Sequence, residues 1–93
     1  MTYRRSRLEI YLEVLRAIGN GTHKPSRIIY RTNILWRTLM DALNLLLENQ
    51  LIEVKRINKF KRYYITPKGR KVLWYFEKVR EALPMEFFNR ESV

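Results

Sequence analysis

The sequence predicts a mostly α-helical domain with one β-hairpin, in the order helix, helix, helix, hairpin, helix. Apolar residues recur at helical spacing in residues 8–18 and 36–47, and again after Pro67. Between the last two of these segments, residues 51–65 are rich in β-branched and aromatic residues, which are typical of strands. This order of elements is that of a helix-turn-helix followed by a β-wing.

The first helix is predicted to begin at Arg7. Ser6 and Glu9 form an S-x-x-E capping box, which satisfies free N–H groups at a helix N-terminus. The helix should end at Gly19-Asn20-Gly21, because glycine tolerates the left-handed conformation that is common at helix ends. Its apolar stripe consists of Leu8, Tyr11, Leu12, Leu15 and Ile18.

Two further helices are predicted on either side of a tight turn at Thr32-Asn33. Pro25 suits the first turn of a short second helix that runs through Tyr30. The third helix should end near Asn49-Gln50, and its apolar stripe is expected to comprise Trp36, Leu39, Leu43, Leu46 and Leu47. The short connection between these helices is the one that a helix-turn-helix requires.

The predicted hairpin turns at Asn58-Lys59. In that register the face that covers the core carries Ile52, Val54, Tyr63 and Ile65. Nearer the tip, two successive opposed pairs carry like charges: Arg56 with Lys61, and Lys55 with Arg62. Such pairs destabilise a hairpin, and a phosphate backbone beside them would relieve the repulsion. At the tip, Ile57 and Phe60 either cap the hairpin, touch a neighbouring chain or enter a minor groove.

The last helix is expected to start after the cap Thr66, with Pro67 in its first turn, and to end at about Leu83, where Pro84 interrupts it. Four apolar residues spaced four, three and four apart form a short seam that predicts a homodimer interface: Val72, Phe76, Val79 and Leu83. The alternative is that a single chain buries both apolar faces of this helix. The chain is therefore divided into a helix-turn-helix and wing region (1–66) and a dimerising helix and tail (67–93), within a single domain overall.

The charge balance favours a polyanionic partner. Nineteen Lys and Arg against nine Asp and Glu give 93 residues a formal charge of +10, and no acidic residue occurs between Val14 and Met40 or between Val54 and Phe76. Nucleic acid is the first candidate and an anionic membrane the second, although no segment is long and apolar enough to span a membrane. The absence of Cys and the single His exclude thiol chemistry and Cys- or His-rich metal sites. We therefore expect no enzyme activity, cofactor, metal or evident small-molecule ligand, and a cytoplasmic, nucleoid-associated location.

The candidate DNA-binding residues fall into three groups. The polar face of the third helix would read bases through Arg37, Thr38, Asp41 and Asn44. The wing would contact phosphates through Lys55, Arg56, Lys59, Lys61 and Arg62. The second helix and its approach would contact further phosphates through Lys24, Ser26, Arg27 and Arg31. The alternative is an ordinary solvated basic surface. A basic arm at Arg4, Arg5 and Arg7 either reaches DNA or forms a frayed end.

Four segments resemble the small archaeal winged-helix DNA-binding proteins, in particular the ten-kilodalton dimeric chromatin-type class. They are RRSRLEIYLEVLRAI at residues 4–18, IIYRTNILW at 28–36, LNLLLENQLIE at 43–53 and YYITPKGRKVL at 63–73. The resemblance implies a homodimer through the last helix, with the third helix and the wing on duplex DNA. Three positions depart from it: Gln50 replaces the usual glycine, Leu35 replaces a small polar residue, and Pro84 should shorten the last helix.

The expected function is therefore binding of double-stranded DNA by a homodimeric transcriptional regulator or architectural protein. An RNA- or ribosome-binding protein is the first alternative, because the same basic face suits RNA. A protein-interaction adaptor that uses the wing is the second.

Overall fold

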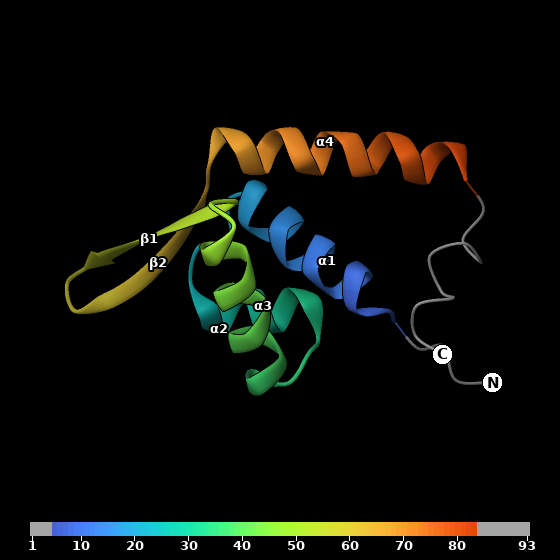
Figure 1. The fold of residues 1–93 in the computed structure, drawn as a ribbon. Coiled ribbons are helices and arrows are strands. Elements are labelled where there is room, and N and C mark those ends of the chain that lie inside the picture. Colours follow the sequence, from blue (N-terminus) through green and yellow to red (C-terminus); the bar gives the residue numbers. More distant parts are fainter. Residues whose placement is uncertain (1–4, 84–93) are drawn as a thin grey trace.

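The computed structural model describes residues 5–83, which form four helices and one antiparallel two-stranded sheet (Figure 1). The elements are α1 (Arg7–Gly19), α2 (Pro25–Thr32), α3 (Trp36–Glu48), β1 (Ile52–Ile57), β2 (Phe60–Ile65) and α4 (Pro67–Ala82). The predicted order is confirmed. Helix α1 lies between α4 and the α2–α3 pair, and the hairpin projects away from the helices (Figure 1). The tail beyond Leu83, including Pro84, and the arm residue Arg4 lie outside the described residues.

The capping box at the start of α1 is formed as predicted. The Ser6 hydroxyl accepts from the Glu9 N–H at 3.1 Å, and the Glu9 carboxylate accepts from the Ser6 N–H at 3.3 Å. Arg5, just before the box, is a structural residue rather than a frayed end. Its guanidinium pairs with Glu13 at 2.6 Å and donates to the carbonyls of Thr32 at 2.6 Å and Asn33 at 3.0 Å. Arg5 therefore fastens the chain before α1 to the turn between α2 and α3.

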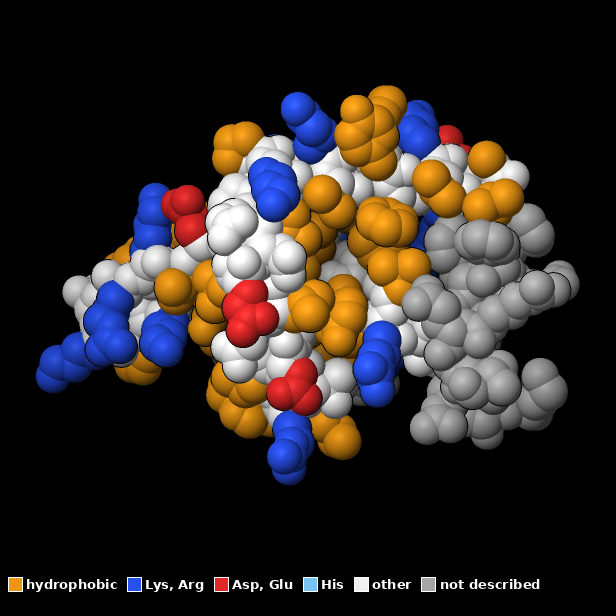
Figure 2. Space-filling view, in the orientation of Figure 1, with side chains coloured by type: hydrophobic (Ala, Val, Ile, Leu, Met, Phe, Trp, Pro, Cys, Tyr) orange, Lys and Arg blue, Asp and Glu red, His pale blue; other side chains and the backbone are white. Residues whose placement is uncertain are grey.

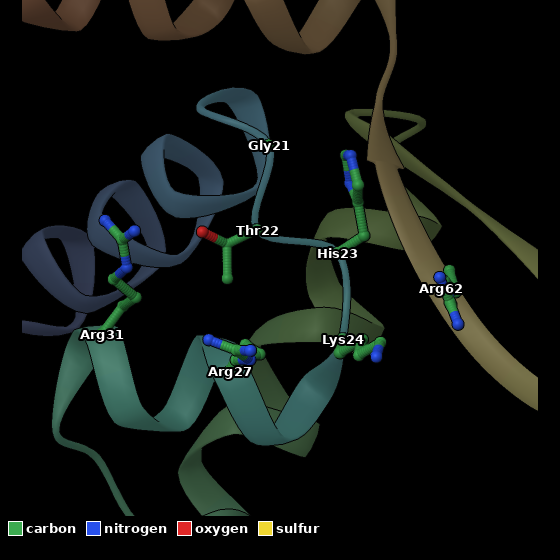
Figure 3. A pocket seen from close by; sticks show the side chains of 7 residues that line it. All are labelled: Gly21, Thr22, His23, Lys24, Arg27, Arg31 and Arg62. Carbon is green, nitrogen blue, oxygen red and sulfur yellow. The ribbon is translucent and has the colours of Figure 1, made fainter.

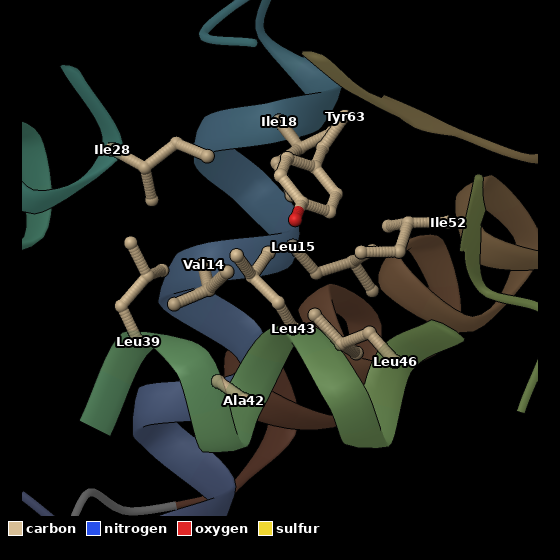
Figure 4. Close-up of a cluster of buried hydrophobic side chains, with 10 residues drawn as sticks. All are labelled: Val14, Leu15, Ile18, Ile28, Leu39, Ala42, Leu43, Leu46, Ile52 and Tyr63. Atoms are coloured by element: carbon tan, nitrogen blue, oxygen red, sulfur yellow. The ribbon is translucent and has the colours of Figure 1, made fainter. Parts of the chain in front are cut away.

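The core is built where α1, α2, α3 and the base of the hairpin meet (Figure 4). Its buried members are Val14, Leu15, Ile18, Ile28, Leu39, Ala42, Leu43, Leu46, Ile52 and Tyr63. Burial raises the pKa of the Tyr63 hydroxyl, because the charged phenolate is poorly solvated there. The fold therefore stabilises the neutral hydroxyl over the phenolate. This contribution to the free energy of unfolding is lost only as the pH rises through the raised pKa.

Two residues predicted to face the core do not. Trp36, expected in the buried stripe of α3, is 55% exposed because it is the first residue of the helix and lies beyond the turns that contact α1. Val54, expected to cover the core with its partner Tyr63, is exposed because the hairpin leaves the helices beyond that pair. The predicted register is otherwise confirmed, from Ile52 opposite Ile65 to Ile57 opposite Phe60.

The tight turns of this chain place residues other than glycine in the left-handed region. Asn33, between α2 and α3, has φ 54°, and Gln50, after α3, has φ 57°. Gln50 thus takes a left-handed conformation that usually favours glycine at the end of a helix. Asn58 and Lys59 have φ 52° and 72°, which are the values of a type I′ hairpin turn and confirm the two-residue connection.

The junction between α3, the hairpin and α4 is built around Thr66. Its hydroxyl accepts from the Gly69 N–H at 3.0 Å, which confirms the predicted cap, and donates to the Gln50 carbonyl at 2.6 Å. Its backbone N–H donates to the Leu51 carbonyl at 3.1 Å. That carbonyl lies against Gly69, where any side chain would overlap it. The junction therefore holds the start of α4 against the base of the wing.

Helix α4 is attached to α1 by ion pairs as well as apolar contacts. Arg16 of α1 makes two hydrogen bonds to the Glu77 carboxylate, at 2.6 and 3.3 Å. Further along α4, Arg80 lies 3.6 Å from the buried Glu9 carboxylate. Within residues 5–83, no helix is both long enough and apolar enough to cross a membrane.

Candidate nucleic-acid interface

Cations from α2 and from the wing meet around one hollow of about 270 Å³ (Figure 3). Arg31 extends from α2 toward α1, Arg27 lies one turn nearer the start of α2, and Arg62 lies on β2 near Lys24 (Figure 3). The hollow is lined by Gly21, Thr22, His23, Lys24, Arg27, Arg31 and Arg62. Two groups of cations that are separate in the sequence therefore form one surface.

A second groove, of about 460 Å³, separates the start of α2 from the wing. One wall is Lys24, Pro25 and Ser26, and the other is Asn58, Phe60, Lys61 and Arg62. The N-cap of α2 is Lys24, whose side chain has no hydrogen-bond acceptor, so no side chain caps this helix end. A helix N-terminus without a side-chain cap suits an anion, because its backbone N–H groups are free to donate. The cations on both walls of the groove add to that preference.

The loop before α2 is fastened to the wing by His23. The Tyr63 N–H donates to the His23 carbonyl at 3.0 Å, and His23 Nδ1 lies 2.8 Å from the Tyr63 carbonyl. A carbonyl can only accept, so this geometry puts the ring proton on Nδ1. The ring also stacks on Tyr64, with 4.2 Å between centroids, and Lys55 Nζ lies 5.1 Å from the centroid of that tyrosine ring. No pattern in the sequence indicated that His23 makes this connection.

The cations of this surface lack acidic partners within residues 5–83. No carboxylate of those residues lies within ion-pair distance of Lys24, Arg27, Arg31 or Arg62. On the wing, Lys55 lies 3.7 Å from Glu53, a pair so exposed that it contributes little. The acids Glu9, Glu13 and Glu77 are engaged elsewhere in the fold. Figure 2 shows Lys and Arg side chains along the projecting hairpin.

The wing carries its cations on both faces. Arg56 lies opposite Lys61 and Lys55 opposite Arg62, so both predicted like-charge pairs are formed. Lys55, Arg56, Lys59 and Lys61 are exposed, and Arg62 is half-buried against the start of α2.

Of the four residues predicted to read bases, three share one face of α3. Arg37, Asp41 and Asn44 are exposed and are spaced four and three residues apart, which places them on one side of the helix. Thr38 is half-buried, and together with Asp41 it lines a hollow with residues at the start of α1: Arg7, Ile10 and Tyr11. The structure therefore brings Thr38 toward α1 and leaves Arg37, Asp41 and Asn44 on the exposed face of α3.

The predicted seam of α4 divides along its length. Val72 packs against the core and Phe76 is half-buried, so the first part contacts this chain itself. Val79 and Leu83 are exposed, as are the aromatic residues Trp74 and Tyr75.

Comparison with known proteins gives a consistent family match. Residues 4–83 match the winged helix-turn-helix family. An uncharacterized protein of Methanocaldococcus jannaschii is 32% identical over 79 residues, which are 85% of this chain and 34% of that protein. The chain thus spans about a third of the length of this relative.

Solved structures show the same fold. Sso10a-2, described as a DNA-binding protein from Sulfolobus solfataricus, is 30% identical, with a TM-score of 0.67 and 84% of each chain covered. BpsR of Bordetella bronchiseptica, whose DNA binding is regulated by 6-hydroxynicotinic acid, is 19% identical, with a TM-score of 0.73 over 78% of this chain and 55% of that one. At that identity the likeness to BpsR concerns the fold alone.

Proposed function

The chain belongs to the winged helix-turn-helix family, and from that premise we propose that it binds double-stranded DNA as a homodimeric regulator or architectural protein. One observation carries the proposal. Lys24, Arg27 and Arg31 meet Arg62 around a single hollow, with no acidic partner among the described residues. The DNA-binding protein Sso10a-2 supports it as a relative that matches most of this chain.

In this proposal the groove between α2 and the wing follows the phosphate backbone. The start of α2 offers free backbone N–H groups and the charge of Lys24, while Lys61 and Arg62 approach from the other wall. The like-charged pairs of the hairpin favour the bound state, because phosphates between or beside them reduce the repulsion. Helix α3 then faces the major groove, where Arg37 and Asn44 can contact base edges.

A mobility-shift assay over a salt series tests the proposal. Duplex DNA should be bound at low salt, and the logarithm of the binding constant should fall with the logarithm of the salt concentration by about 0.9 for each phosphate neutralised. Double-stranded RNA of the same sequence serves as competitor. Binding that ignores salt, or a preference for RNA, would contradict the proposal. Protection of one operator favours a regulator, and even coverage of any duplex favours an architectural protein.

The homodimer is proposed to form through the exposed apolar residues of α4. A second copy would cover Trp74, Tyr75, Val79 and Leu83, which otherwise face water. Light scattering should therefore give twice the mass of one chain, and Val79→Glu should give the mass of one chain. Val54→Glu on the wing is the matched control, because Val54 is 42% exposed and Val79 is 40% exposed. A single-chain mass for the unmodified protein, or a dimer that survives Val79→Glu, would exclude this interface.

Lys59→Gly should stabilise the protein and weaken DNA binding at the same time. Lys59 has φ 72°, where glycine is favoured, so the change should raise the free energy of unfolding by about 0.5–1 kcal/mol. It also removes a cation from the wing tip, and the salt slope should become smaller by about 0.9 if that cation contacts a phosphate. Thermal unfolding and the mobility-shift assay measure the two effects.

Lys59→Ala separates the two effects, because it removes the charge but keeps the left-handed turn unfavourable. It should weaken DNA binding as much as Lys59→Gly without the gain in stability. Unchanged DNA binding in both variants would show that the wing tip does not touch DNA.

A further inference from the structure

Three large apolar side chains are exposed within seven residues, at the end of α2 and the start of α3. Tyr30 is 84% exposed, Leu35 is 78% exposed and Trp36 is 55% exposed. Hydrophobic side chains accordingly lie at the lower end of the molecule, where α3 begins (Figure 2). Single exposed apolar residues are ordinary, but three within seven residues around one helix–helix turn indicate a contact surface.

Leu35 also does not stabilise the start of α3. It is the N-cap of α3 and makes no side-chain cap, a position where Ser, Thr, Asp or Asn would accept a hydrogen bond from the first turn. Its exposure means that burial in this chain does not offset the missing cap. A residue that serves neither the helix nor the core of its own chain is best explained by a contact with another molecule.

The surroundings of this apolar turn favour an anionic partner. Arg27, Arg31 and Arg37 flank it in the sequence and are exposed, and no acidic residue occurs between Val14 and Met40. A second copy would bring the same positive charges face to face, which opposes its own binding. A duplex offers both negative charge and an apolar group, because the thymine 5-methyl group lies on the base edge in the major groove.

The turn is held in place before any partner arrives. Arg5 donates to the carbonyls of Thr32 and Asn33, and Asn33 takes the left-handed conformation that ends α2. A fixed backbone therefore presents the side chains at the start of α3. In helix-turn-helix proteins, the N-terminal residues of this recognition helix contact base edges.

We infer that Leu35 and Trp36, with Tyr30 at the end of the preceding helix, form an apolar reader of thymine 5-methyl groups in the major groove. The inference rests on the proposed function and adds a base preference to it. Affinity then comes from the cations of α2 and the wing, while the preference for A·T pairs comes from the start of α3.

Replacing thymine by uracil tests the inference, because the change removes only the 5-methyl groups and keeps the base pairing. Two duplexes of alternating A·T pairs, one with thymine and one with uracil, are compared in the mobility-shift assay. The unmodified protein should bind the thymine duplex more tightly, by about fourfold for each methyl group that is buried. Trp36→Ala and Leu35→Ser should bind the two duplexes equally.

Two features keep the test decisive. Leu45→Ala on the second half of α3 is the control, since Leu45 is 36% exposed and belongs neither to the proposed dimer surface nor to the cationic surface, and it should retain the thymine preference. Leu35→Ser supplies the missing cap of α3, so the disappearance of the preference in that variant cannot be ascribed to unfolding. Equal affinity of the unmodified protein for both duplexes would overturn the inference and leave the proposed function intact. Absence of duplex binding at low salt would overturn both, and a Trp36→Ala protein that no longer dimerises would assign this turn to a second copy instead.

Discussion

Gly69→Ala should lower the free energy of unfolding by about 3 kcal/mol, although glycine to alanine inside a helix normally stabilises a protein. A Cβ at residue 69 would overlap the Leu51 carbonyl oxygen and lie 2.8 Å from Ile65 Cγ1. The carbonyl cannot move away freely, because it accepts the Thr66 N–H at 3.1 Å. The substitution must therefore push the start of α4 off the base of the wing.

Gly19→Ala is the matched control for this prediction. Gly19 is the last residue of α1, and a Cβ there would meet only the ends of the Ile65 and Leu73 side chains, at 3.3 and 3.5 Å. We expect a change within about 1 kcal/mol in either direction, because helix propensity and the tight contact oppose each other. Urea unfolding followed by circular dichroism measures both variants. A Gly69→Ala protein as stable as the Gly19→Ala protein would show that the junction is more adaptable than its geometry indicates.

The double variant Arg27→Gln, Arg62→Gln should bind duplex DNA about a hundredfold more weakly, or roughly tenfold for each cation removed. The two side chains reach the same hollow from α2 and from β2 and have no acidic partner there within residues 5–83. The slope of the salt dependence should become smaller by about 1.8, because two phosphates are no longer neutralised. Glutamine keeps much of each side chain, so the fold should persist.

The control removes the same charge from another element. Lys71→Gln with Lys78→Gln takes two exposed cations from α4, on the other side of α1 from the α2–α3 pair (Figure 1). That double variant should keep the salt slope nearly unchanged. Equal weakening by the two double variants would mean that net charge alone drives binding, without a defined interface.

The sequence was most informative where structure is decided locally. The Ser6–Glu9 box, the Thr66 cap and the Asn58-Lys59 turn each depend on residues a few positions apart, and each is formed as predicted. The Asn58-Lys59 turn also determined the register of the whole hairpin, because two-residue connections leave no freedom in pairing. The fold could therefore be predicted almost completely from local signals.

Burial was less predictable, because it depends on which elements lie above a residue. Trp36 fits the apolar spacing of α3 as well as Leu39 does, yet only Leu39 lies under α1 and α2. Val54 alternates correctly along its strand but lies where the hairpin has left the helices. Periodicity identifies the face of an element, and it does not show how far along that face the core extends.

The candidate interface was predicted as three separate groups, and its assembly was not foreseen. The hollow joins Arg27 to Arg62, and the His23–Tyr63 hydrogen bonds join residues forty positions apart. No local pattern signals such a pairing. Arg5 shows the same limit, since a residue in a basic arm proved to hold the turn between α2 and α3.

The bonding of His23 to Tyr63 also divides the wing mechanically. Strand β2 is bonded to the loop before α2 at that pair, and the part of the hairpin that projects beyond it is short and runs from Lys55 to Arg62. The cations at the wing tip therefore lie beyond the last of these bonds, whereas Lys24 and Arg27 belong to a helix that packs on the core through Ile28. A single histidine thus fixes the spacing between the two sets of cations.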